Sequence, residues 1–331
     1  MPELARFYTR TDWINGTDEM KFFCSFLSII LLTSPGFSPA QETPQQSTLV
    51  AGTRVSLTPP AEFTLSAQFP GYQQESTGAS IMVTEIPGPF AEVSAGFSVP
   101  AELAKKGMTL QTKEEITVDG RTALLLQIWQ VAAGKEFLKW ILAFGNANET
   151  VMVMATFPKQ HESDRSEKLR TSLLTVTWDS EKSVSPTEGL SFTLSEKGEM
   201  KLAKRMANML IYTKGGIMPT EGEDVPLFII GQSISKVNVE DPESLAKLSL
   251  LQNDSVADIE IEQPVKVLID SLSGYEIIAK GMSAKSKQPT VIYQMMLFED
   301  QNYYIMLGMV GSEKREAYLQ VFREMAGSFR R

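Results

Sequence analysis

Short apolar runs separated by polar links recur in each half of the chain. The run Val151–Ala155 is apolar on both alternating faces, and so is Ile305–Val310 around Gly308. Such runs are typical of strands that are covered on both faces of a sheet. The links Ala133–Gly134 and Glu299–Asn302 leave room only for hairpins, so the pattern predicts antiparallel meanders.

The periodicity predicts the same order of elements twice. The first series consists of a strand at Ile81–Ile86, a helix opening at Pro100, strands over 109–118, 121–132, 136–145 and 149–157, and a closing helix over 164–176. The second consists of a strand at Leu227–Ile234, a helix opening at Pro242, strands over 258–269, 273–281, 289–299 and 302–310, and a closing helix over 313–329. Helices before and after each meander predict an α+β fold of two tandem α/β/α sandwiches, each with an antiparallel meander sheet covered by helices.

The predicted helices carry signals of their own. Proline in the first turn of a helix loses no hydrogen bond, and Asp241 before Pro242 is a good N-cap. The last helix has one apolar stripe at helical spacing, formed by Tyr318, Val321, Phe322, Met325 and Phe329. Both features support helices at these places.

Identities between the two series indicate a duplication. Four residues at the first helix match at an offset of 142, namely Pro100, Leu103, Ala104 and Lys105 with Pro242, Leu245, Ala246 and Lys247. Four strand positions match at an offset of 154, namely Gly120, Phe144, Val151 and Val153 with Gly274, Phe298, Ile305 and Leu307. The change of offset predicts an insertion near Gln252–Pro264 in the second copy.

The duplication predicts two domains, at 54–179 and 188–331. The segment 180–187 is rich in serine, proline and charge, which is typical of a linker. A polar spacer is expected at 41–53, and residues 1–40 are expected to be a signal peptide with its upstream residues.

The first forty residues have the pattern of an export signal. Phe22–Leu32 is an apolar run, Lys21 precedes it, and small residues end at Ala40, which predicts cleavage after Ala40. Residues 1–19 make a poor positively charged region, so translation is expected to start at Met20. The alternative is a genuine extension that makes the apolar run a signal anchor. Export predicts a periplasmic or secreted protein.

Charge and cysteine content narrow the class of partner. The 331 residues carry a net charge of -9, which repels phosphate backbones, so we expect no nucleic-acid partner. Cys24 is the only cysteine and lies inside the signal, so no disulfide or lipid anchor is expected. The run Phe22–Leu32 is shorter than the roughly 20 residues that span a bilayer, so no transmembrane segment is expected in the mature chain.

Candidate catalytic and metal-binding residues are few. His161 is the only histidine, and a solvated residue before a helix is favoured over a general base. Two acidic groups lack the spacing of a calcium loop, namely Glu221, Glu223 and Asp224, and Asp254, Asp258, Glu260 and Glu262. Core filling is favoured over copper binding for the methionines of the central strands, Met152, Met154, Met295, Met296, Met306 and Met309. We predict no catalytic residue, cofactor or metal.

Two tryptophans are the candidate binding residues. Trp129 and Trp140 stand in successive predicted strands of the first copy, and their counterparts in the second copy are not tryptophan. On a common face they would form an aromatic patch for a partner or a sugar. Packing in the core is the favoured alternative for both.

The order of elements, the proline-initiated helix and the closing helix in both halves resemble the PsbP-like and DcrB-like α/β/α sandwich superfamily. The resemblance implies an accessory or partner-binding protein, and no site motif of that superfamily can be placed on residues of this chain. We therefore expect an exported, non-catalytic binding or assembly module of the cell envelope with a protein partner. The alternatives are a carboxylate-dependent envelope hydrolase and a carrier of an apolar ligand.

Overall fold

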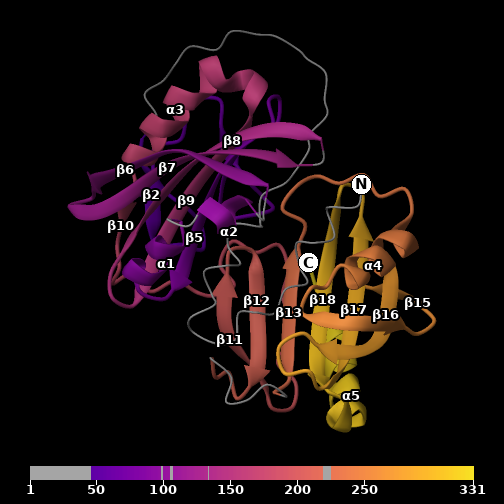
Figure 1. The fold of residues 1–331 in the computed structure, drawn as a ribbon. Coiled ribbons are helices and arrows are strands. Elements are labelled where there is room, and N and C mark those ends of the chain that lie inside the picture. The colour runs from indigo at the N-terminus through magenta and orange to yellow at the C-terminus, as the bar shows by residue number, and fades with distance from the viewer. Residues whose placement is uncertain (1–45, 98–99, 105–106, 133, 219–224) are drawn as a thin grey trace. The chain divides into compact units, whose positions relative to one another are not determined.

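The computed structural model describes residues 46–331 except 98–99, 105–106, 133 and 219–224. The predicted signal, with Met20, Cys24 and the cleavage point after Ala40, lies outside the described residues. The chain divides between Gly189 and Leu190 into two compact units, here called the first and second domains (Figure 1).

The first domain is built on a seven-stranded antiparallel sheet of order β3-β4-β5-β9-β8-β7-β6. Its strands are β3 (Thr64–Leu65), β4 (Gly71–Gln74), β5 (Ala79–Pro87), β6 (Met108–Val118), β7 (Arg121–Ala132), β8 (Lys135–Gly145) and β9 (Glu149–Pro158). Strands β6 to β9 form the predicted meander, and β5 joins it beside β9. The short strands β3 and β4 were not predicted.

Helices cover both faces of this sheet. The closing helix α3 (Glu162–Leu174) follows the 3-10 turn η5 (Lys159–His161) and packs mainly on β8 and β9. On the other side lie α1 (Phe90–Gly96), which contacts β8 and β9, and α2 (Pro100–Ala104), which contacts β6 (Figure 1). The predicted sandwich and the helix opening at Pro100 are therefore confirmed, whereas α1 was not predicted.

A second, three-stranded sheet belongs to the first domain. It pairs β1 (Thr48–Leu49) and β10 (Thr177–Trp178) with β2 (Val55–Leu57). The predicted spacer at 41–53 is wrong for its last residues, because Val50 and Thr53 are buried and Val50 belongs to the core. The apolar segment is short and lies between polar residues, so the sequence pattern did not indicate that it is buried.

The second domain repeats this plan on an eight-stranded sheet. Its strands are β11 (Met200–Met206), β12 (Met209–Lys214), β13 (Leu227–Gln232), β14 (Val256–Ile261), β15 (Val265–Ile269), β16 (Leu272–Ser283), β17 (Pro289–Glu299) and β18 (Asn302–Gly311). The order is β11-β12-β13-β18-β17-β16-β14, and β15 also pairs with β16. Strands β11 and β12 were not predicted.

The two helices of the second domain lie on opposite faces of this sheet. Gln294 of β17 donates from Nε2 to the carbonyl oxygen of Ala246 in α4 (Pro242–Leu251) at 2.7 Å. The preceding residue, Tyr293, shares a core with Phe322 of α5 (Arg315–Gly327), which follows the turn η6 (Ser312–Lys314). Successive side chains of a strand point to opposite faces, so the sandwich is confirmed here as well. The Asp241 side chain caps α4 as predicted, accepting from the Ser244 amide at 3.1 Å.

The strand predicted over 258–269 is two strands, β14 and β15, which pair with successive parts of β16. Pro264 lies between them and has no amide hydrogen for a ladder, and the β14 register shifts between Ala257 and Glu260. The apolar pattern over 258–269 therefore predicts one strand, although Pro264 divides the segment into two.

Three of the four matches in the second set, those at Phe144, Val151 and Val153, are shifted by one residue, and Gly274 corresponds to Ala123 rather than to Gly120. Val151 lies in the core beneath α3, but Ile305 lies outside the corresponding cluster and Tyr304 lies within it. Likewise Phe144 corresponds to Leu297 rather than to Phe298. The offset from β8 to the closing helix is therefore 153 rather than 154. A shift of one residue matters because it moves a side chain to the other face of the sheet.

Candidate functional site

Trp129 of β7 and Trp140 of β8 share one face of the first sheet. The register places Trp129 opposite Leu138 and Gln127 opposite Trp140, so the two rings are diagonal neighbours. Leu138 and Trp140 belong to the same core as Leu169 of α3, which identifies their face as the one that α3 covers. The side chains therefore meet on one face, and their role in binding stays a prediction.

Trp140 is a core residue. Its side chain is only 6% exposed, and its Nε1 donates to Oγ of Ser166 in α3 at 3.0 Å. The guanidinium carbon of Arg170, also in α3, lies 5.8 Å from the ring centroid. These contacts fix the closing helix on the sheet, as the core alternative predicted for this residue.

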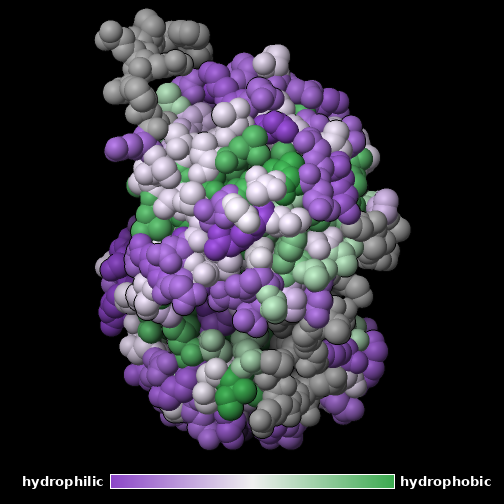
Figure 2. Space-filling model, turned by 90° about the vertical axis from the view of Figure 1, so that its left-hand side faces the viewer, coloured by the Kyte–Doolittle hydropathy of each residue, from purple (hydrophilic) through white to green (hydrophobic). Residues whose placement is uncertain are grey.

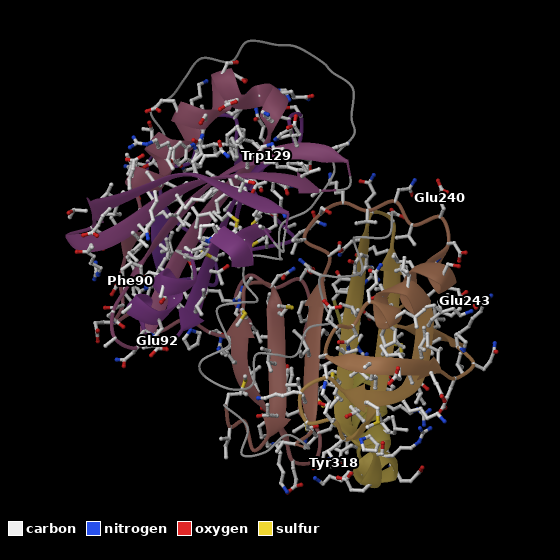
Figure 3. The ribbon with its side chains drawn as sticks, viewed as in Figure 1. Phe90, Glu92, Trp129, Glu240, Glu243 and Tyr318 are labelled. Carbon is white, nitrogen blue, oxygen red and sulfur yellow. The ribbon has the colours of Figure 1, made fainter. Side chains whose placement is uncertain are left out.

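Trp129, which is labelled in Figure 3, is only partly buried. Two charged side chains hold its ring. Its Nε1 donates to Oε1 of Glu136 at 3.0 Å, and Nζ of Lys159 lies 5.6 Å from its ring centroid. Lys159 also donates to the same Glu136 oxygen at 3.1 Å. This hydrogen bond from Lys159 is the main cause that lowers the pKa of Glu136. The ring is thus oriented at the surface rather than left to rotate.

The sheet around Trp129 is open toward β6 and β7. Thr109 lies opposite Trp129, and Thr112 lies opposite Gln127 on the same face. Val131, two residues beyond Trp129, is 44% exposed. We call this area the Trp129 surface, and it consists of Thr109, Thr112, Gln127, Trp129, Val131, Glu136 and Lys159.

Exposed apolar residues do not by themselves mark a site in this protein. Figure 2 shows one face on which small apolar areas are scattered among polar ones. Such scattering is normal for a folded protein. The Trp129 surface differs because a large aromatic ring is fixed there by a hydrogen bond to Glu136 and a cation–π contact with Lys159.

The second domain has no tryptophan at the corresponding place. Lys280 of β16 lies opposite Val291, as Trp129 lies opposite Leu138. Its Nζ forms an ion pair with Oε2 of Glu260 at 2.9 Å. An aromatic surface in the first domain is thus matched by an exposed ion pair in the second, and the two domains present different chemistry.

A cluster around Trp178 was missed as a candidate site in the sequence. Trp178 is buried, with Arg54 and Arg121 at 5.4 and 5.3 Å from its ring centroid. Its Nε1 donates to Oε1 of Glu85 at 2.9 Å. Arg54 donates to Glu85 at 2.8 Å and to Glu149 at 2.7 Å, which links the three-stranded sheet to β5 and β9. Burial lowers the pKa of Arg54, but hydrogen bonds and the charges of both carboxylates outweigh it and raise that pKa.

The two carboxylates of this cluster suit ion pairing. Oε1 of Glu85 accepts from Nε of Arg54 and from Nε1 of Trp178, and Oε2 accepts from the Arg54 amide at 3.1 Å. All three donors come from the segments that carry the three-stranded sheet, namely Arg54 before β2 and Trp178 in β10. This pair therefore fits a structural link between two sheets.

The other acidic candidates are dispersed among separate cations. Within the described residues, no group of three or more His, Cys, Asp and Glu side chains has the arrangement of a metal site. Glu260 binds Lys280, and Glu262 binds Arg315 at 2.7 Å. The predicted loop group of Glu221, Glu223 and Asp224 lies outside the described residues.

His161 and the methionines fit structural roles. His161 ends η5 and is partly exposed, with its Nε2 at 3.2 Å from Nε2 of Gln160. Five of the six methionines on central strands are buried, as core filling predicts, and these are Met152, Met154, Met295, Met296 and Met306. Met309 is partly exposed.

In the part of the chain that the structure describes, no helix has the length and apolar character needed to cross a bilayer. No protein-family model matches the sequence. No curated protein matches it either.

Comparison with solved structures finds several proteins of low sequence identity to which the chain is similar. The chain is similar to PsbP (CyanoP) from Synechocystis sp. PCC 6803, with 12% identity and a TM-score of 0.30 over 44% of this chain and 98% of that one. It is also similar to LpqN of Mycobacterium tuberculosis, described as involved in cell envelope biogenesis, with 9% identity, a TM-score of 0.32 and coverage of 42% and 81%. The immunity protein TplEi of T6SS from Pseudomonas aeruginosa matches over 87% of this chain and 97% of its own, with 14% identity and a TM-score of 0.34. A PsbP protein is thus among the matches, as the order of elements led us to expect.

Proposed function

We propose that this protein is an exported, non-catalytic binding module that holds a protein partner of the cell envelope on the Trp129 surface. The observation that carries the proposal is the partly exposed Trp129 ring, fixed by Glu136 and Lys159 on an open part of the sheet. A preoriented aromatic side chain loses little conformational entropy when a partner covers it. Tryptophan is also one of the residue types enriched at the energetic centre of protein interfaces.

The surroundings of Trp129 suit an interface with another protein. Val131 adds apolar area, while Thr109, Thr112 and Gln127 offer hydrogen-bonding groups around it. Protein interfaces commonly place polar groups around a central apolar anchor. The corresponding position in the second domain is Lys280, so the proposal assigns binding to the first domain and support to the second.

The test begins with capture from an envelope extract by the chain 41–331, read by mass spectrometry with T6SS proteins among the candidates. The captured protein is then purified, and its affinity is measured by calorimetry against Trp129→Ala. We expect a loss of about 30-fold or more, because hot-spot residues contribute about 2 kcal/mol or more. Lys280→Ala, at the matched position of the second domain, is expected to bind as the unaltered chain does. Equal affinity for Trp129→Ala would contradict the assignment to this surface.

The absence of catalysis is tested separately. Purified chain 41–331 is incubated with envelope glycans, lipids and peptides, and products are followed by mass spectrometry. No turnover is expected. Turnover that Glu85→Gln or Glu149→Gln abolishes would instead establish the carboxylate-dependent hydrolase and overturn the proposal.

Export is tested on the full chain with a C-terminal tag. After expression in a Gram-negative host, we expect the protein in the periplasmic or secreted fraction with Gln41 as its first residue, measured by intact mass. Retention in the membrane with the apolar run intact would instead establish a signal anchor. Retention in the cytoplasm would contradict export.

A further inference from the structure

The outer edge of β15 is apolar and exposed. Among the described strands, β15 pairs only with β16, so its other edge carries unpaired backbone groups. Leu268 is 71% exposed and Val265 is 54% exposed, the two highest exposures among large apolar residues of the second domain. An exposed apolar edge of this kind is a template for pairing with another strand.

The other long edges of the two sheets carry protective features that β15 lacks. Strand β6 has a register shift and a charged run at Lys113–Glu115. Strand β14 has a register shift between Ala257 and Glu260. Bulges, charges and proline are the usual devices against edge pairing. Strand β15 pairs in regular register along its whole length and carries a single charge, Lys266.

The turn after β15 determines which of its residues offer hydrogen bonds to a partner. Asp270 and Ser271 have φ of 49° and 64°, the pattern of a two-residue type I′ turn, so Ile269 and Leu272 form the hydrogen-bonded pair that closes the hairpin. Ladder bonds alternate along an antiparallel strand. The N–H and C=O groups of Leu268 therefore point away from β16, and so do those of Lys266.

We propose that two copies of this chain pair edge to edge through β15, antiparallel, with the two-fold axis at Leu268. In that register Leu268 faces Leu268 of the second copy and exchanges two backbone hydrogen bonds with it. Val267 faces Ile269 of the second copy. The strand is thus complementary to itself in backbone hydrogen bonding and apolar character, which is the property that an isologous interface requires.

A disulfide test reads the register directly. Cys24 is the only cysteine, so Leu268→Cys in a Cys24→Ser background introduces a single thiol. Opposed residues of a hydrogen-bonded antiparallel pair have Cα atoms about 5.5 Å apart, within the range of a disulfide. We expect oxidation to give a covalent dimer at least about 10-fold faster than the matched control Leu251→Cys. Leu251 is an exposed leucine of the helix α4 and not of the β15 strand.

Association without a cross-link provides the second test. We expect sedimentation equilibrium of the unaltered chain to show a concentration-dependent dimer. Leu268→Lys brings two positive charges together at the axis and is expected to give a monomer, whereas Leu251→Lys is expected to remain dimeric. Circular dichroism checks that each variant is folded. A monomer at all concentrations, or equal cross-linking rates for Leu268→Cys and Leu251→Cys, would overturn the proposal and leave the Trp129 surface unaffected.

Discussion

Trp178→Ala is expected to lower the free energy of unfolding of the first domain by about 3–5 kcal/mol, the usual cost of deleting a buried tryptophan. The ring is buried in the core, touches Phe144 edge to face and lies against Arg54 and Arg121. Its removal also takes from Glu85 a hydrogen bond at 2.9 Å. Urea unfolding followed by far-UV circular dichroism measures the loss.

Two further variants separate the contributions at Trp178. Trp178→Phe keeps an aromatic ring but removes Nε1, so we expect a smaller loss than for alanine. Trp129→Ala truncates a partly exposed tryptophan of the same domain and is expected to cost less than Trp178→Ala. If Trp178→Ala and Trp129→Ala lowered stability equally, the Trp178 cluster would not join the two sheets of the first domain.

The long strands could be predicted because their apolar pattern is local. Strands β6 to β9 and β16 to β18 are long enough for the periodicity to identify them, and the short links between them impose hairpins. Burial on both faces follows from helices on both sides of the sheet. The order of strands within each sheet was less accessible, because the pairing of β5 with β9 joins segments that no turn connects.

The Trp178 cluster could not be predicted, because its parts are distant in the sequence. Arg54 reaches carboxylates that lie 31 and 95 residues away, and no periodicity links them. The strand that contains Trp178 is also too short to give a pattern of its own. Such contacts exist only once the sheets are assembled.

The two closing helices make an equivalent arginine contact with their sheets, which a search for identical residues does not reveal. At the offset of 153, Arg170 corresponds to Arg323, and Trp140 corresponds to Tyr293. Each arginine extends from the closing helix and binds a carboxylate on the sheet. In both domains a large buried aromatic residue of the central strand lies beneath this helix.

The carboxylate that receives this arginine changes strand between the domains. In the first domain it is Glu114, opposite Leu125, and in the second it is Glu276, opposite Val265. These two cross-strand pairs occupy equivalent places in the two sheets. Glu114 corresponds to Val265 and Leu125 corresponds to Glu276, so the carboxylate and the apolar side chain have exchanged strands. A search for identical residues finds neither position, although the contact with the helix is retained.

Gly308→Ala is expected to destabilise the second domain by overpacking. A Cβ atom at Gly308 would lie 2.4 Å from Cδ2 and 2.7 Å from Cε2 of Phe322, whose ring is fully buried. Overpacking of this kind costs about 1–3 kcal/mol. Gly327→Ala provides the matched control, because its added Cβ meets nothing within 4 Å. Urea unfolding is expected to show a loss for the first variant and a change within about 0.5 kcal/mol for the second.

A second substitution tests whether the Phe322 ring is the cause. Phe322→Leu removes ring atoms that the new methyl group would meet, and alone it is expected to destabilise the domain by leaving a cavity. In the double variant with Gly308→Ala, the methyl group occupies part of that space. The combined loss is therefore expected to be smaller than the sum of the two single losses by about 0.5–3 kcal/mol, the range measured for residues in contact. Additive losses would mean that Gly308 is required for a reason other than the close approach of α5 to β18.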